Sequence, residues 1–93
     1  MKSIIQSEKE CWVCGKTRCL EEHHCMGGNP NRKNSEKYGL KIWLCLEHHR
    51  GQTGVHNDQA LCDFVHQVAQ QAFEKEHSRE EFMAIFGRNY LED

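Results

Sequence analysis

The sequence has little of what marks a membrane-bound or linker-rich chain. It contains one proline, no long apolar run and no stretch rich in Pro, Gly and Ser, which argues against a low-complexity protein. The first ten residues turn polar after two isoleucines, too early for the apolar part of a secretory signal. Hydrophobic residues make up 38% of the 93 residues, and a chain of this size buries only a thin core. We therefore expect one cytoplasmic domain over residues 1–93, away from membranes, that needs a further source of stability.

Six cysteines and seven histidines offer that source. In a reducing compartment cysteines stay free or bind metal rather than form disulfides. Two pairs, Cys11-Trp-Val-Cys14 and Cys45-Leu-Glu-His48, have two residues between the ligands, a spacing that lets a tight turn direct both side chains at one ion. We predict a structural Zn²⁺ on which folding depends, held by Cys11, Cys14, Cys45 and His48. The alternatives are buried free thiols, or a variant site that uses Cys19 or Cys25.

The charges divide unevenly along the chain. Residues 1–56 hold nine Lys and Arg against six Asp and Glu, a net of +3, whereas residues 57–93 hold three against eight, a net of −5 with histidine counted as neutral. A basic half suits a polyanion, and the acidic half is expected to face away from it. Five basic residues are candidates for contacts with a phosphate backbone, the alternative being that they only keep a loop soluble. They are Arg32, Lys33, Lys37, Lys41 and Arg50.

The pattern of residues predicts an α+β protein. Strands are expected over 20–25 and 40–44, joined by a turn and a helical stretch at 31–37 and followed by a helix that begins around 45–49. An apolar stripe predicts a long amphipathic helix over 57–77, capped by Asn57 or Asp58. The stripe consists of Leu61, Phe64, Val65, Val68, Ala69, Ala72 and Phe73.

Residues 78–93 are expected to form a short helix and a tail. Ser78 and Glu81 have the spacing of a capping box, and Gly87 is placed to end the helix. Its buried face is predicted to consist of Phe82, Ile85 and Phe86.

A second group of histidines remains once His48 is assigned to zinc. Adjacent residues of a regular strand point to opposite faces, so His23 and His24 can serve one site only if the strand bulges or ends there. His48 and His49, at a helix start, diverge by about 100°, so His49 can face a separate cavity. His56 precedes the long helix, whose dipole favours a neutral imidazole; capping or packing there is the alternative. His66 and His77 are expected to be ordinary surface residues.

The order of these motifs resembles a known family. Cys11-x-x-Cys14, Glu22-His23-His24 and Leu44-Cys45-x-x-His48-His49 are similar to the HNH, or His-Me finger, endonucleases, especially small phage-associated nucleases with a zinc-binding cysteine frame. The resemblance covers residues 11–57 and implies a zinc-stapled ββα-metal core followed by C-terminal helices. It implies a metal-dependent endonuclease that hydrolyses DNA phosphodiester bonds, with nicking as the expected product.

The resemblance also implies roles for particular residues. His24 becomes the general base, His23 and His49 become ligands of a catalytic divalent ion, and His56 is our candidate third ligand. Mg²⁺ prefers oxygen ligands, so Mn²⁺, Ni²⁺ and Zn²⁺ stay open beside it. The family usually has an asparagine before the second strand, where this chain reads Tyr38-Gly39-Leu40. The candidates to replace it, among which spacing does not choose, are Asn29, Asn31 and Asn34.

Some alternatives stay open at this point. Double-stranded and branched DNA both suit the implied activity, and a homodimer or a phage or recombination protein is left open as partner. A non-catalytic zinc-ribbon-like module that binds nucleic acid or protein is the main competing function, although it has no use for a second histidine group. A third hypothesis is a thiol protein that uses Cys11-x-x-Cys14, which the lack of a βαβ pattern disfavours.

Overall fold

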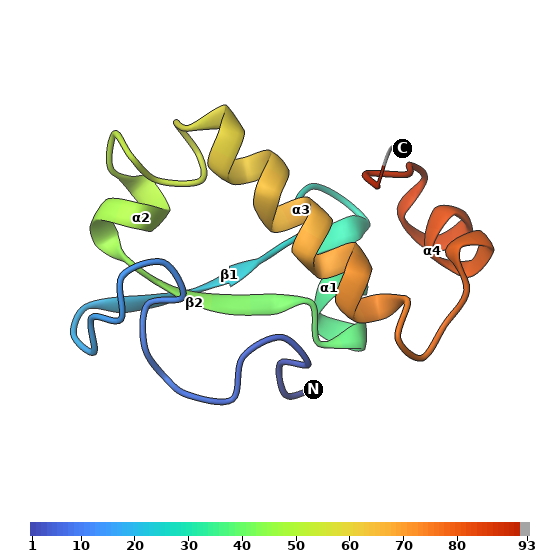
Figure 1. Cartoon of the computed structure of the whole chain (residues 1–93), viewed down its shortest axis with the longest axis horizontal. Helices are drawn as coiled ribbons and strands as arrows, with labels where there is room; N and C mark the ends of the chain where they lie inside the picture. Colours follow the sequence, from blue (N-terminus) through green and yellow to red (C-terminus); the bar gives the residue numbers. More distant parts are fainter. Residues whose placement is uncertain (92–93) are drawn as a thin grey trace.

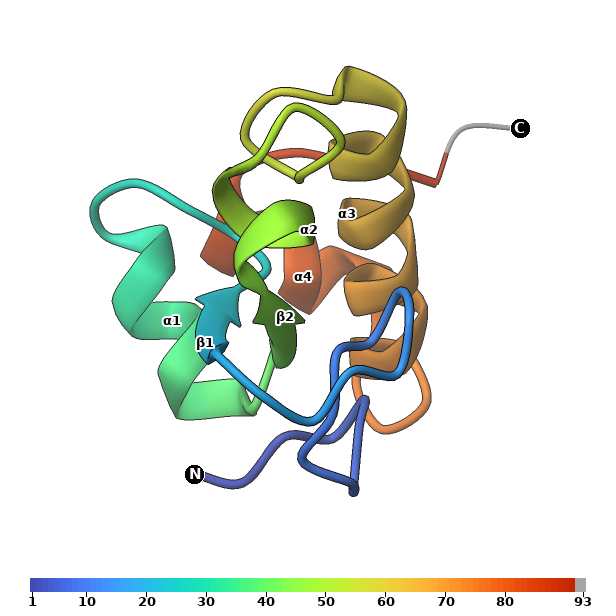
Figure 2. The same ribbon diagram turned by 90° about the vertical axis from the view of Figure 1, so that its left-hand side faces the viewer.

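The computed structural model describes residues 1–91; the last two residues of the predicted tail, 92–93, lie outside the described residues. The chain has the α+β architecture that the sequence predicts, with two antiparallel strands followed by helices and the cysteine cluster beside the strands. Figure 2 shows α1 on one side of the strand pair and α3 on the other. The elements are β1 (Leu20–His24), α1 (Asn31–Tyr38), β2 (Lys41–Cys45), α2 (Leu46–Arg50), α3 (Gln59–Phe73) and α4 (Arg79–Phe86) (Figure 1).

The strand pair is short and has one edge covered. Its register runs from Leu20 opposite Cys45 to His24 opposite Lys41, so β1 ends at His24. The N-terminal segment covers the outer edge of β2, because the Trp43 amide donates to Oε1 of Gln6 at 2.9 Å and the Trp43 carbonyl accepts from the Trp12 amide at 2.8 Å. Covering an edge in this way removes a site for unwanted strand pairing.

Helix α3 differs from the sequence prediction in its end and in its buried face. Its start is capped by Asp58, whose carboxylate accepts from the Leu61 amide at 3.1 Å, but it ends at Phe73 rather than near residue 77. The buried side chains are Val65, Ala69, Gln70 and Phe73, whereas Phe64 of the predicted stripe is exposed. Within residues 1–91, no helix is both long and apolar enough to cross a membrane.

The buried face of α3 includes Gln70, a polar residue outside the predicted stripe that is fully buried. Its side-chain nitrogen donates to Glu74 at 2.7 Å and to Asn89 at 2.9 Å, and its oxygen accepts from the Tyr90 amide at 2.7 Å. A buried amide with all these partners is well tolerated. Gln70 therefore ties the segment after α4 to α3, which hydrophobic periodicity alone does not predict.

Helix α4 has the predicted ends. Ser78 Oγ accepts from the Glu81 amide at 3.1 Å while the Glu81 side chain accepts from the Ser78 amide at 3.1 Å, and Gly87 ends the helix at φ +81°. Phe82 and Phe86 are buried, and Ile85 is half-buried. Helix α4 also holds α1, because the side-chain nitrogens of Asn31 and Asn34 donate to the carbonyls of Phe86 and Ile85 at 3.3 and 3.4 Å.

Candidate functional site

Four side chains from three parts of the chain form a compact sulfur and nitrogen cluster. Cys11 and Cys14 lie on a turn closed by the Gly15 amide, which donates to the Cys11 carbonyl at 2.8 Å. Cys45 is the last residue of β2, and His48 lies in α2. The donor atoms of the four side chains all lie within 4.8 Å of one another.

The distances in this cluster fit a tetrahedral ion. Sγ of Cys14 lies 3.8 Å from Sγ of Cys45, and Nδ1 of His48 lies 3.3 Å from Sγ of Cys45 and 3.8 Å from Sγ of Cys11. Zinc–sulfur bonds of about 2.3 Å at tetrahedral angles separate two sulfurs by about 3.8 Å. The Cys11, Cys14, Cys45 and His48 grouping is therefore consistent with a structural zinc site.

Local electrostatics lower the pKa of one of these thiols, that of Cys11. Burial acts to raise the pKa of the Cys11 thiol, but backbone hydrogen bonds from Cys45, Cys14 and Val13 outweigh it and lower the pKa to about 6. At Cys14 the Lys16 backbone acts to lower the pKa, but desolvation and the neighbouring Cys11 and Cys45 raise it overall. A divalent cation bound at these sulfurs would favour the thiolate form of Cys14 as well as of Cys11, because metals bind thiolates.

The other three cysteines lie outside this cluster and differ in exposure. Cys25 is buried, with 2% of its surface exposed, whereas Cys19 is exposed and Cys62 is intermediate. The variant zinc site that would use Cys19 or Cys25 therefore has no counterpart among the groups of metal-binding side chains in residues 1–91.

We expect alkylation to separate these thiols. Burial raises the pKa of Cys25 to about 12, and the thiolate is the reactive form. Cys25 should therefore stay unmodified by iodoacetamide at pH 7.5, while Cys19 reacts within minutes in the same zinc-loaded sample. Mass spectrometry of the digested protein measures both sites. Equal labelling of Cys19 and Cys25 in folded protein would contradict the burial of Cys25.

A second group of side chains consists of three histidines. His23 comes from β1, His49 from α2, and His56 from the loop before α3. The ring centroids of His23 lie 5.2 Å from His49 and 5.4 Å from His56, and those of His49 and His56 lie 4.8 Å apart. One nitrogen from each ring lies within 4.8 Å of the others, so this histidine triad could hold a metal ion.

The surroundings of the histidine triad suit metal binding. Burial and the neighbouring His49 and His56 lower the pKa of His23 to about 3, which keeps its imidazole neutral and able to bind a cation. Nδ1 of His49 lies 2.8 Å from Oε1 of Glu21, which leaves Nε2 for an ion; such carboxylate partners orient metal-binding histidines. Arg50 holds the same carboxylate by two hydrogen bonds of 2.9 and 2.6 Å.

The histidine triad lies in a pocket of about 340 Å³ that His24 also lines. His23 and His24 are consecutive, but β1 ends at His24, which is the condition under which both can serve one site. Arg32, at the start of α1, is the cation among the lining residues. The pocket is lined by Glu22, His23, His24, Gly27, Gly28, Arg32, His49 and His56.

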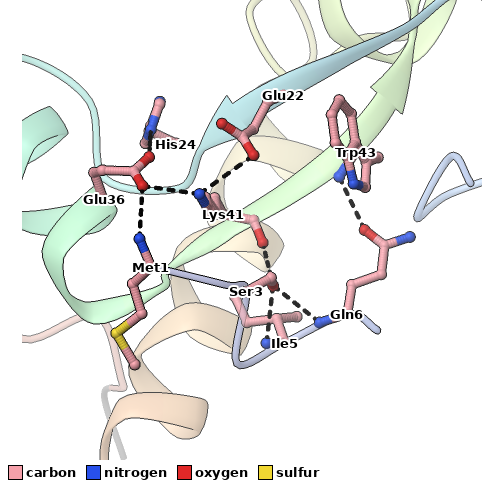
Figure 3. Close-up of polar contacts among 9 residues, drawn as sticks. All are labelled: Met1, Ser3, Ile5, Gln6, Glu22, His24, Glu36, Lys41 and Trp43. Carbon is pink, nitrogen blue, oxygen red and sulfur yellow. Dashed lines mark hydrogen bonds and ion pairs between the residues drawn. The ribbon is translucent and has the colours of Figure 1, made fainter. Parts of the chain in front are cut away.

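On the α1 side of β1, His24 belongs to a hydrogen-bonded group (Figure 3). Nε2 of His24 lies 2.8 Å from Oε1 of Glu36, and the Lys41 ammonium donates to the other carboxylate oxygen of Glu36 at 2.9 Å. Lys41 also pairs with Glu22 at 3.4 Å, and the Met1 amine lies 3.0 Å from Glu36. Hydrogen bonds from His24, Lys41 and this amine lower the pKa of Glu36 to about 2.

The five basic candidates for phosphate contacts lie in different environments. Arg32, Lys33 and Lys37 are exposed on α1. Lys41 is not, because its side chain is 12% exposed and lies between Glu36 and Glu22. Arg50 is exposed but is held by Glu21. The three α1 residues are therefore the candidates that face solvent and form no ion pair within residues 1–91.

Sequence reasoning missed two carboxylates, and it did not choose among three candidate asparagines. Glu21 lies two residues before His23, on the same face of β1, so strand alternation could have found it. Glu36 has no such signal, because its contact depends on how α1 packs against β1. Asn31 and Asn34, candidates to orient the base, instead hold the end of α4.

His66 is also less ordinary than expected. It is half-buried, its ring centroid lies 4.6 Å from that of Tyr90, and burial lowers its pKa. His77 packs on Phe73 at 4.5 Å. Both histidines therefore help to hold the C-terminal part and lie outside the groups that can bind metal in residues 1–91.

Two of the side-chain groups in residues 1–91 that could hold a metal ion, the Cys3His cluster and the histidine triad, are joined by the neighbours His48 and His49; a third consists of Glu22, His24 and Glu36. The first fits a structural ion, and the second opens to a pocket. Comparisons of the chain with models of protein families, with curated proteins and with solved structures found no match.

Proposed function

We propose that this protein is a metal-dependent endonuclease that hydrolyses DNA phosphodiester bonds and leaves nicks. The observation that supports the proposal is the pocket in which His24 lies beside the histidine triad and Arg32. A domain whose only metal has a structural role has no need for this second set of imidazoles. The family resemblance of residues 11–57 leads to the same activity.

Hydrolysis of a phosphodiester needs a base for the attacking water and relief of the charge on phosphate. An imidazole can accept a proton at neutral pH, and His24 is the pocket histidine outside the triad. His23, His49 and His56 would hold the catalytic ion, which when bound supplies Lewis-acid stabilisation of charge. The guanidinium of Arg32 adds a positive charge for a phosphate oxygen.

The ligand set narrows the choice of catalytic ion. Three imidazole nitrogens suit Mn²⁺, Ni²⁺ or Zn²⁺ better than Mg²⁺, which prefers oxygen. Glu21 fixes the orientation of the His49 ring through its contact with Nδ1. We propose a transition metal at the triad and Zn²⁺ at the Cys3His cluster.

The substrate is expected to approach over α1. Arg32, Lys33 and Lys37 are exposed there, and Arg32 connects this surface to the pocket. A few phosphate contacts position DNA without reading its sequence and give binding that weakens with salt. The acidic C-terminal part would repel the same polyanion, which limits DNA to this face.

The decisive experiment is cleavage of supercoiled plasmid by zinc-loaded protein. We expect nicked circles with added Mn²⁺ or Ni²⁺, little product without added ion, and weaker cleavage with Mg²⁺. His49→Ala should abolish the response to added ion while the protein keeps its tight zinc, measured by metal analysis of the same sample. No nicking with any divalent ion would instead favour the non-catalytic zinc module.

A further inference from the structure

One carboxylate contacts the residue that we propose as the general base. Oε1 of Glu36 lies 2.8 Å from Nε2 of His24, and the two residues come from different elements, α1 and β1. None of the asparagines considered from the sequence makes such a contact among the described residues, and two of them, Asn31 and Asn34, are engaged with α4.

The contact determines which ring nitrogen carries the proton. Glu36 is ionised over the working pH range, since its hydrogen bonds from His24, Lys41 and the Met1 amine lower its pKa. An ionised carboxylate only accepts hydrogen bonds. Nε2 of His24 must therefore donate, which leaves Nδ1 of the neutral ring with the lone pair that can accept a proton.

We propose that Glu36 is a positioning residue, whose carboxylate fixes the ring and tautomer of His24 so that Nδ1 is the atom that accepts the proton of the attacking water. The water proton moves to Nδ1, the hydroxide oxygen bonds to phosphorus, and the bond between phosphorus and the leaving oxygen breaks; that oxygen keeps the electron pair and takes a proton from solvent. This inference rests on the proposed nuclease function. In this chain Glu36 would serve in place of the asparagine that is missing before the second strand.

Lys41 completes the arrangement. Its ammonium lies 2.9 Å from Glu36 and 3.4 Å from Glu22, and its low exposure keeps it there. Oxygen and nitrogen atoms of Glu22, His24 and Glu36 also lie close enough to hold a metal. Because the Lys41 ammonium pairs with both carboxylates and the Met1 amine also pairs with Glu36, this group is better described as a support for His24 than as a third ion site.

The first test measures the tautomer directly. In nitrogen-15 NMR of zinc-loaded protein, His24 of the wild type should show a protonated Nε2 and an unprotonated Nδ1. Glu36→Ala should shift His24 towards a mixture of tautomers and leave the His77 signals unchanged. A wild-type His24 protonated on Nδ1 would overturn the proposal, whether or not the protein cleaves DNA.

The second test measures cleavage by single and double variants. Glu36→Ala should lower kcat by roughly 10²-fold with KM for DNA within about twofold, and Glu36→Gln, whose amide oxygen can accept from Nε2, should recover part of this loss. In a His24→Ala background, Glu36→Ala should cause no further loss. Losses that multiply in the double variant would overturn the proposal, because Glu36 would then act by another route.

Glu74→Ala is the matched control. Glu74 is a hydrogen-bonded carboxylate paired with Arg79 at 3.1 Å, far in the sequence from the pocket residues, and its loss should leave kcat unchanged. Zinc content and melting temperature are measured for every variant. Active wild type with an unaffected Glu36→Ala variant rejects the role of Glu36 alone, whereas inactive wild type rejects the nuclease function.

Discussion

Replacing Cys45 with serine is expected to leave the protein unfolded at 25 °C. Apparent zinc-binding free energies of ~10–16 kcal/mol in finger-type peptides span the upper half of the ~5–15 kcal/mol that separates folded from unfolded states of whole domains. Cys45 joins β2 to α2 and contributes a donor atom to the Cys3His cluster. Circular dichroism and zinc analysis of the purified variant measure both losses.

Cys19→Ser is the control for this experiment. Cys19 is exposed and lies outside the cluster, so its replacement should keep one zinc per chain and the wild-type melting temperature. Excess chelator should unfold the wild type and Cys19→Ser alike. A Cys45→Ser variant that melts cooperatively at the wild-type temperature would show that the cluster is dispensable for folding.

The second large effect is expected at His24. His24→Ala should lower the rate of plasmid nicking by ~10²–10⁴-fold, the range that general bases contribute, without loss of zinc or of folded structure. The rate should fall because His24 lines the pocket, and the zinc should stay because His24 belongs neither to the Cys3His cluster nor to the histidine triad. Single-turnover cleavage with saturating metal gives the rate.

His77→Ala serves as its control, because His77 packs on Phe73 at the far end of α3 and does not line the pocket. It should nick at the wild-type rate after a small loss of melting temperature. If His24→Ala nicked as fast as His77→Ala, the base would have to be a different group.

The parts of the fold that the sequence predicts are those with local causes. The capping box of Ser78 and Glu81 involves residues three apart, and the two zinc pairs each lie within four residues. The strand pair and the α+β class follow from similarly short patterns and are confirmed. Such features need no knowledge of how distant elements pack.

The parts that could not be predicted depend on contacts between distant elements. Gln70 is buried in α3 with its side chain hydrogen-bonded to Asn89 and Tyr90, which lie about twenty residues away in the sequence. Glu36 reaches His24 only because α1 packs against β1. Hydrophobic periodicity reports which residues prefer burial but not which polar group a distant segment will satisfy.

The adjacency of His48 and His49 has a consequence for how ions load. One side chain belongs to the Cys3His cluster and the next to the histidine triad, and both sit on α2, a helix of five residues. So short a helix has little stability of its own. We therefore expect affinity at the triad to depend on prior occupation of the cysteine site, so that zinc starvation would leave the proposed nuclease inactive even when other divalent ions are plentiful.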